Sequence, residues 1–278
     1  MTKKIDTEAF QLLEQDSKIG VLATLDEAGY PHLTFLSSIQ ALDETHLAFG
    51  QFCRGLSKRF ILERPEVGFL ALDAQKRYLR GHAVYTHSET SGAVFDLYNA
   101  KPLFRYNSYM GFSRIHFFDL LDVTRLSALP MGAVVLGALC SRIKALFCSV
   151  SKNGALPQAG MKLISELDSL KFLCYQTRRG RLRILPVIQA AAAGTDRIVF
   201  AGIPFGDELA CVPDGCKAAV LCVNLKMESV LVKGAFHPGR LDIERVYNSM
   251  PPKMEYVYPR PDALEAITAF ESECAASR

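Results

Sequence analysis

Short apolar runs separated by polar turns fill about the first ninety residues, which is the pattern of an antiparallel sheet. Apolar residues at helical spacing predict a short amphipathic helix over 5–16. Gly29 marks the turn of the first hairpin, because glycine readily adopts the positive φ that tight turns require. Strands are predicted over 19–25, 31–41, 46–52, 67–72 and 78–87, and a second short helix is predicted over 57–63.

The same order of blocks returns about 150 residues later along the chain. Residues 17–29 align with 167–180, 38–41 with 187–190, 47–50 with 198–202, and 98–102 with 247–251. A steady offset of this length indicates two tandem copies of one domain rather than a solenoid of short units. We therefore expect a first domain over 1–128, a helical connector over 129–159 and a second, degenerate domain over 160–278.

Many short strands with few helices favour a small antiparallel barrel in each copy, so the expected class is mainly β with a tandem duplicated barrel. Of the 278 residues, 49% are hydrophobic, which suffices for a sizeable core and excludes a disordered chain. The 32 basic and 29 acidic residues leave a net charge of +3 without a dense basic block. We therefore expect no nucleic-acid partner.

Two further patterns bear on location and metal binding. The most apolar segment, 129–139, is much shorter than the roughly 20 residues of a membrane span, and the charged N-terminus lacks the apolar run of a secretory signal. These features predict a cytoplasmic protein without a membrane partner. The eight cysteines form no CxxC pair, and Cys211, Cys216 and Cys222 lack standard ligand spacing, so reduced thiols and no metal site are expected.

The order of strands, glycine turn and short helix resembles a known family, the pyridoxamine 5′-phosphate oxidase-like FMN-binding split barrels. The residues that carry the resemblance are Gly29-Tyr30-Pro31, the strand over 32–39, Ser57-Lys58, the segment 64–69 and the segment 80–83. The resemblance covers about residues 15–125 and extends loosely to the second copy. It implies a split β-barrel that binds FMN.

The resemblance also implies where FMN would lie. It places the phosphate at Arg54, Ser57 and Lys58, and a helix N-terminus beside a cation independently suits a dianion. Further cofactor contacts are expected from the second strand and from the end of the third. These are Thr34, Phe35, Leu36, Ser37, Ser38, Gln51 and Phe52.

The chain departs from the family pattern at two places. Thr34 stands where the family often has an arginine, which weakens any assignment to the pyridoxamine phosphate reaction. Asp207 and Glu208 of the second copy stand where the first copy has basic and hydroxyl groups, and carboxylates repel phosphate. We therefore expect one FMN site, built by the first copy, with the second copy as an internal partner that covers the flavin ring. Pairing of two chains into a homodimer stays open.

Substrate contacts and catalytic residues are harder to name. Arg105 and Tyr106 lie in an aromatic segment that does not recur in the second copy, so we expect them, with His116, to contact substrate. No residue is assigned as a catalytic acid or base.

Taken with the resemblance, these patterns predict an FMN-dependent oxidoreductase that acts on an unknown small molecule, with reduced nicotinamide as a candidate partner. Two alternatives remain on the same fold. One is haem or a deazaflavin in the same groove, and the other is a non-enzymatic flavin-binding or sensor protein.

Overall fold

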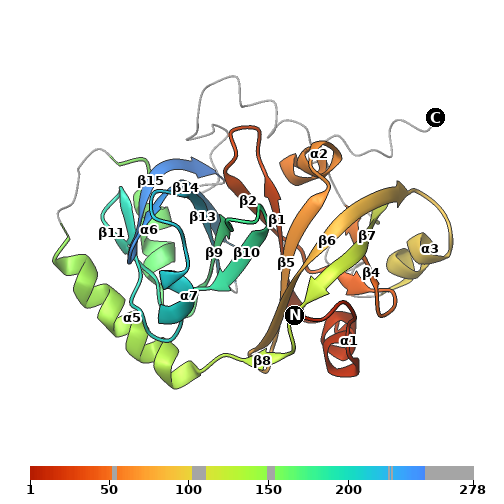
Figure 1. The fold of residues 1–278 in the computed structure, drawn as a ribbon, viewed down its shortest axis with the longest axis horizontal. Helices are drawn as coiled ribbons and strands as arrows, with labels where there is room; N and C mark the ends of the chain where they lie inside the picture. The colour runs from red at the N-terminus through yellow and green to blue at the C-terminus, as the bar shows by residue number, and fades with distance from the viewer. Residues whose placement is uncertain (52–54, 102–110, 149–153, 225, 227, 248–278) are drawn as a thin grey trace. The chain divides into compact units, whose positions relative to one another are not determined.

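The computed structural model describes residues 1–51, 55–101, 111–148, 154–224, 226 and 228–247. Within these residues the chain forms two compact units, shown in Figure 1. The first comprises residues 1–24 and 34–128, and the second comprises residues 129–247 together with 25–33. The tip of the first hairpin therefore belongs to the second unit.

The first unit is built on one antiparallel sheet with the strand order β2-β1-β5-β6-β7-β4-β3, and β8 pairs with β6. Its strands are β1 (Lys18–Leu25), β2 (Pro31–Phe35), β3 (Gln40–Ala41), β4 (His46–Gln51), β5 (Glu66–Asp73), β6 (Arg77–Glu89), β7 (Arg114–Val123) and β8 (Ser127–Ala128). Its helices are α1 (Thr7–Glu14), α2 (Leu56–Glu63) and α3 (Ala93–Ala100). The sheet coils around an apolar core that includes Leu22, Phe49, Phe69 and Phe118.

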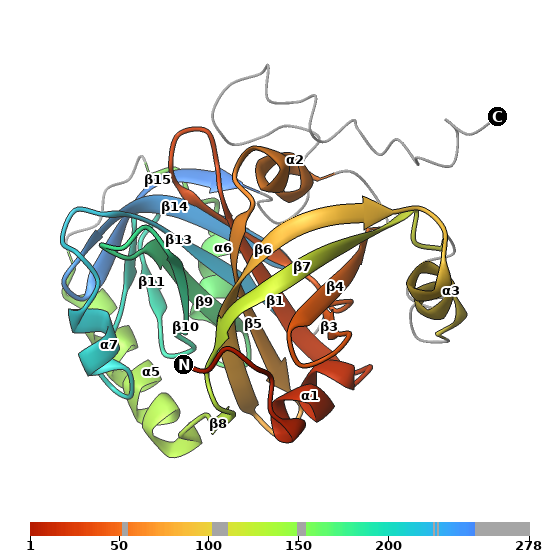
Figure 2. The same cartoon turned by 45° about the vertical axis from the view of Figure 1, so that its right-hand side comes forward.

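The second unit repeats this sheet, with the order β10-β9-β13-β14-β15-β12-β11. Its strands are β9 (Leu170–Gln176), β10 (Leu182–Pro186), β11 (Ala191–Ala193), β12 (Arg197–Val199), β13 (Lys217–Val223), β14 (Ser229–His237) and β15 (Arg240–Tyr247). Its helices are α5 (Met131–Leu146), α6 (Gln158–Ser165) and α7 (Gly206–Ala210). Figures 1 and 2 show that both sheets are strongly coiled.

The two sheets also match at individual residues, not only in strand order. In the first hairpin, Asp26 Oδ1 accepts a hydrogen bond from the Tyr30 amide over 2.8 Å. In the second unit, Thr177 Oγ1 accepts from the Arg181 amide over 3.2 Å, at positions that lie 151 residues later. A register shift also falls at matching places, after His82 in β6 and after Lys233 in β14. The expected mainly β class is confirmed, and the same sheet order occurs twice, as a tandem duplication predicts.

One predicted strand, over 31–41, is wrong in its length. The structure divides it into β2 and β3, with a turn at Ser37 and Ser38. The Leu36 amide donates to the Gly20 carbonyl over 2.8 Å. An added Cβ at Gly20 would lie only 2.0 Å from the Leu36 carbonyl oxygen, so the close approach requires glycine there. Ser37 and Ser38 therefore do not face opposite sides of a continuous strand.

One of the four repeat blocks is also wrong. Tyr98 lies on α3, between β6 and β7, where its hydroxyl donates to the Ala48 carbonyl over 2.8 Å. Tyr247 instead ends β15, the last described strand. A tight turn at 238–239 joins β14 to β15 and leaves no room for a counterpart of α3. The likeness of 98–102 to 247–251 is therefore a coincidence of sequence.

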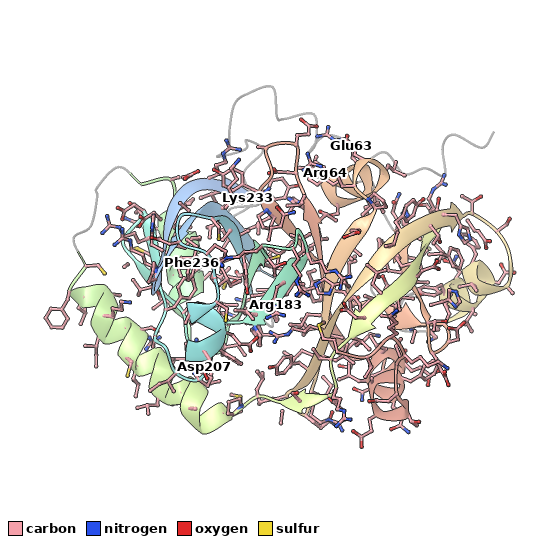
Figure 3. The ribbon with its side chains drawn as sticks, viewed as in Figure 1. Glu63, Arg64, Arg183, Asp207, Lys233 and Phe236 are labelled. Carbon is pink, nitrogen blue, oxygen red and sulfur yellow. The ribbon has the colours of Figure 1, made fainter. Side chains whose placement is uncertain are left out.

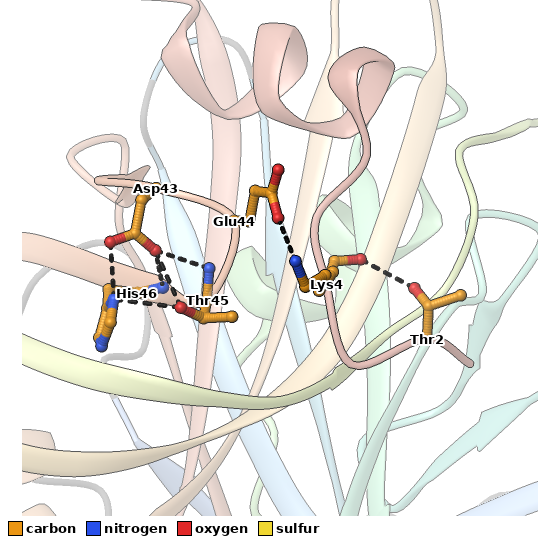
Figure 4. Close-up of polar contacts among 6 residues, drawn as sticks. All are labelled: Thr2, Lys4, Asp43, Glu44, Thr45 and His46. Atoms are coloured by element: carbon orange, nitrogen blue, oxygen red, sulfur yellow. Dashed lines mark hydrogen bonds and ion pairs between the residues drawn. The ribbon is translucent and has the colours of Figure 1, made fainter.

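Polar contacts define the turn that precedes β4 (Figure 4). Asp43 Oδ1 accepts hydrogen bonds from the amides of Thr45 and His46 over 2.7 and 2.9 Å. Partial desolvation raises the pKa of Asp43, but hydrogen bonds from the Thr45 amide, the His46 imidazole and the Thr45 hydroxyl outweigh it and lower the pKa to about 2. Lys4 Nζ donates to Glu44 Oε2 over 2.6 Å. Asp43 therefore holds the start of β4 to this loop, and Glu44 holds the N-terminal segment to the same loop.

The connector region contains α5, which the structure places in the second unit, packed against β11. No helix within the described ranges has the length and apolar character needed to cross a membrane.

Candidate functional site

The start of α2 has the properties of an anion site. Its N-cap residue is Gly55, and no described side chain caps the helix by a hydrogen bond. Amides at the start of a helix lack the i−4 carbonyl partner and carry partial positive charge. In α2 the Lys58 amide donates to the Gly55 carbonyl over 3.1 Å, so the amides before it and the helix dipole are the backbone groups that would stabilise an anion here.

The Lys58 ammonium lies beside this helix start. A Cβ added to Gly55 would be 3.8 Å from Lys58 Nζ, which shows that the side chain folds back toward the N-cap. The same ammonium lies 5.9 Å from the centre of the Phe49 ring. Lys58 is half-buried, so its charge is partly shielded from water and acts more strongly on a nearby anion.

Two hydroxyl groups complete this end of the first unit. Thr34, on β2, forms a hydrogen bond with Ser57, and either hydroxyl can be the donor. Ser57 is almost fully buried, whereas Thr34 is half-buried. This contact brings β2 against the first turn of α2, as the resemblance implied when it grouped both residues in one cofactor site.

A second polar pair lies where β4 and β7 run side by side. His116 Nε2 lies 2.7 Å from Gln51 Oε1. Because an amide oxygen only accepts, Nε2 must carry the proton, and Nδ1 is left as a bare acceptor. Nδ1 is buried and has no hydrogen-bond partner among the described residues. A buried acceptor of this kind is stabilised by a donor from a ligand or from water.

The surroundings of His116 keep its imidazole neutral. Burial, with the nearby positive charges of Lys58 and Arg114, lowers the pKa of His116 to about 3. The ring stacks on Phe49 with centres 5.0 Å apart. Arg114 donates to Ser88 Oγ over 2.9 Å. His116, Lys58 and Arg114 are therefore one electrostatic group.

The remaining expected site residues fall into three sets. Leu36 packs in the apolar core, and Ser38 Oγ donates to the Gly50 carbonyl over 3.1 Å while accepting from the Gly50 amide, so both have structural roles. Phe35 and Ser37 are half-buried. Phe52, Arg54, Arg105 and Tyr106 lie outside the described residues.

Among its described residues, the second unit lacks the counterpart of this anion site. The chain from the start of β4 to the start of β5 is as long as the chain from the start of β12 to the start of β13. This equal spacing places Glu208 at the position of Ser57 and Leu209 at that of Lys58. Asp207 and Glu208 form the first turn of the short helix α7, and Figure 3 shows Asp207 on it. Carboxylates here would repel a phosphate.

The end of α2 away from the proposed anion site carries Glu63 and Arg64, which are also labelled in Figure 3.

Sequence reasoning did not identify Phe49 or Arg114 as neighbours of the site. Both belong to strands whose pairing joins residues more than sixty positions apart, Phe49 opposite His116 and Gln51 opposite Arg114. The alternation of β4 and β7 could have suggested the two faces but not the register between them. Among the described residues, no group of histidine, cysteine and acidic side chains could hold a metal ion.

Of the comparisons with known proteins, the one with solved structures found proteins similar to this chain. No family model and no curated protein sequence matches the chain. HupZ from Group A Streptococcus is 14% identical, with 43% of this chain and 91% of that chain covered at a TM-score of 0.36. An FMN-binding protein from Syntrophomonas wolfei is 15% identical, with 43% and 88% covered at 0.34. HutZ, the haem storage protein of Vibrio cholerae, is 14% identical, with 45% and 94% covered at 0.32.

The similar structures also include candidate pyridoxamine 5′-phosphate oxidases from Lactobacillus delbrueckii and Listeria innocua, 18% and 14% identical to this chain. At these TM-scores they assign neither a ligand nor an activity to this chain.

Proposed function

We propose that the first unit binds FMN, with the phosphate at the start of α2. The observation that carries the proposal is the Lys58 ammonium folded against a helix N-terminus that no described side chain caps. Ser57 and Thr34 add hydroxyl groups at the same end. Backbone amides, a cation and hydroxyl donors are the groups that hold a phosphate dianion in proteins.

Bound FMN supplies hydride or electron transfer, and the chain supplies position and polarity. In this proposal Lys58 and the first turn of α2 hold the phosphate. His116 stays neutral, and its buried Nδ1, which has no partner among the described residues, would accept a hydrogen bond from the ligand or from water. Gln51 fixes which imidazole nitrogen carries the proton. We propose that the protein acts as an oxidoreductase on a small molecule, with reduced nicotinamide as the candidate electron donor.

Comparison of FMN with riboflavin tests the phosphate site directly. The two ligands share the ring and ribityl chain and differ in the phosphate. We expect FMN to bind at least about tenfold more tightly, since charge-assisted hydrogen bonds to a phosphate contribute about 1.5–3 kcal/mol. Equal affinities would overturn the assignment of the phosphate to α2.

A second measurement separates an enzyme from a carrier. The FMN-loaded protein is mixed with reduced nicotinamide under anaerobic conditions, and bleaching of the flavin absorbance is followed. Bleaching much faster than that of free FMN supports an oxidoreductase. A flavin that is bound but is reduced no faster than free FMN would leave flavin binding in place and remove the nicotinamide-dependent activity.

A further inference from the structure

Helix α5 presents an apolar outer face that no described residue of the second unit covers. Figure 1 shows the helix along the margin of that unit. The exposed fractions of its outer side chains range from 49% at Leu139 to 85% at Phe147. The full set is Val135, Leu136, Leu139, Ile143, Leu146 and Phe147. Soluble proteins rarely leave so many large apolar groups together in water without a partner.

The opposite face of α5 is firmly seated on its own unit. Val134, Gly137, Ala138 and Ser141 are buried. Ser141 Oγ accepts a hydrogen bond from the Ala201 amide over 2.9 Å. Gly137 lies so close to the Ile203 carbonyl that a Cβ would clash with it at 2.1 Å. The outer face therefore belongs to a rigidly held helix and not to a loose segment.

The outer residues follow the spacing of a helix–helix seam. Gly132, Leu136, Leu139, Ile143 and Leu146 are separated by four, three, four and three positions. This alternation of three and four places them on one stripe, as in the a and d positions of a coiled coil. At 3.6 residues per turn, the positions of this stripe lie on the side of the helix opposite the buried positions. Such a pattern fits another helix with matching apolar side chains.

The charges of α5 argue against a lipid surface as the occupant. Helices that lie on membranes carry lysine and arginine along a polar face that meets the headgroups. The cations of α5 are Arg142 and Lys144, and both donate to carbonyls of the second unit. The Lys144 bond to Gly239 measures 2.9 Å. The outer stripe itself carries no charge.

We infer that α5 is the interface through which two copies of this chain form a symmetric dimer. A two-fold axis brings the stripe of one α5 against the same stripe of its partner, so one apolar surface covers the other. The six large apolar side chains, with exposed fractions of 49–85%, would supply the apolar centre of the ~800 Å² that each partner contributes to a standard interface. The inference does not depend on the proposed FMN site.

Light scattering coupled to gel filtration of the full chain tests the interface. We expect the wild-type protein to run at twice the chain mass. Ile143→Glu and Leu139→Glu should each raise the dimer dissociation constant by at least about a hundredfold, because each places two like charges in one apolar seam. Leu97→Glu is the matched control, since Leu97 is an equally exposed leucine on α3, and it should leave the dimer intact.

Circular dichroism and thermal unfolding show whether the variants fold. Both seam variants should keep the wild-type spectrum, because the substituted side chains face outward. A wild-type protein that is monomeric at all concentrations would overturn the inference, as would a dimer that persists in both folded variants. Binding of the wild-type protein to phosphatidylcholine–phosphatidylglycerol vesicles, lost in Ile143→Glu, would assign the face to a membrane surface instead.

Discussion

His116 and Gln51 form a buried pair across β7 and β4, with imidazole Nε2 and amide oxygen 2.7 Å apart. The residues are 65 positions apart in sequence, and only the pairing of these strands brings them together. The pair fixes the tautomer of a neutral imidazole near two cations, Lys58 and Arg114. Through these charges, the pair in the interior of the first unit is electrostatically coupled to the proposed phosphate site.

The low pKa of His116 predicts a loss of stability in mild acid. The pKa is about 3 in the folded protein and 6.5 in the unfolded chain, so the unfolded chain takes up the proton first. The contribution of this group is fully present above pH 6.5 and is lost as the pH falls toward 3. Between pH 7 and 5 the loss is about 2 kcal/mol. Urea unfolding at both pH values measures it.

His116→Gln keeps a donor for Gln51 and removes the titrating group, so its stability should depend less on pH over the same interval. His87→Gln, at an exposed histidine of β6, should behave as the wild type. An equal acid loss in the wild type and in His116→Gln would show that His116 is not the group responsible.

Removal of the Lys58 ammonium should weaken FMN binding without unfolding the first unit. Lys58→Ala deletes a charge beside the helix start, and we expect an increase of about 10- to 100-fold in the FMN dissociation constant. Flavin fluorescence titration measures the constant. Arg59→Ala, an exposed cation one position along the same helix, is the control and should change the affinity much less. Equal effects of the two substitutions would remove Lys58 as the phosphate anchor.

The second unit suggests how to convert the first into a form that does not bind FMN. Ser57→Glu copies Glu208 into the matching position of α2. Its carboxylate should repel the phosphate and reduce FMN binding by at least about tenfold relative to Ser57→Gln, which has the same size without charge. Circular dichroism checks that both variants fold, because Ser57 is buried. Similar affinities in the two folded variants would contradict a phosphate at this place.

A buried ion pair in the second unit gives a prediction about stability. Lys233 Nζ donates to Asp26 Oδ2 over 2.8 Å, and both side chains are largely shielded from water. Burial lowers the pKa of Lys233, while Asp26 raises it again. Lys233→Met leaves a carboxylate buried without its cation, so we expect a loss of about 3–5 kcal/mol in the free energy of unfolding.

The double variant Asp26→Asn with Lys233→Met should be more stable than Lys233→Met alone, because no unpaired charge remains buried. Urea unfolding of the wild type, of Asp26→Asn, of Lys233→Met and of the double variant completes the double-mutant cycle. Additive losses would mean that the two side chains do not stabilise each other.

Much of the fold was predictable because its signals are local. The short apolar runs of the first copy located β1, β4, β5 and β6, and the short helix predicted over 57–63, ended by Pro65, corresponds to α2. The break between β2 and β3 was not predictable, since it depends on the approach of Leu36 to Gly20 from another strand. The membership of residues 25–33 in the second unit also depends on contacts distant in sequence, such as that of Asp26 with Lys233.

The candidate site divides in the same way. Ser57 and Lys58 were named through the family resemblance, and a helix start with a hydroxyl and a cation is a local pattern that agrees with it. The contact of Thr34 with Ser57, and the group formed by His116, Gln51 and Arg114, required the tertiary structure. Leu36 and Ser38 were expected at the cofactor, but the structure gives them packing and turn roles.

We propose a single FMN site per chain, in the first unit. The most direct measurement is the visible spectrum of the purified protein after incubation with excess FMN and removal of free flavin by gel filtration. We expect retained flavin absorbance at about one FMN per chain. A colourless protein would contradict flavin binding, and two FMN per chain would contradict the acidic second unit as a non-binding copy.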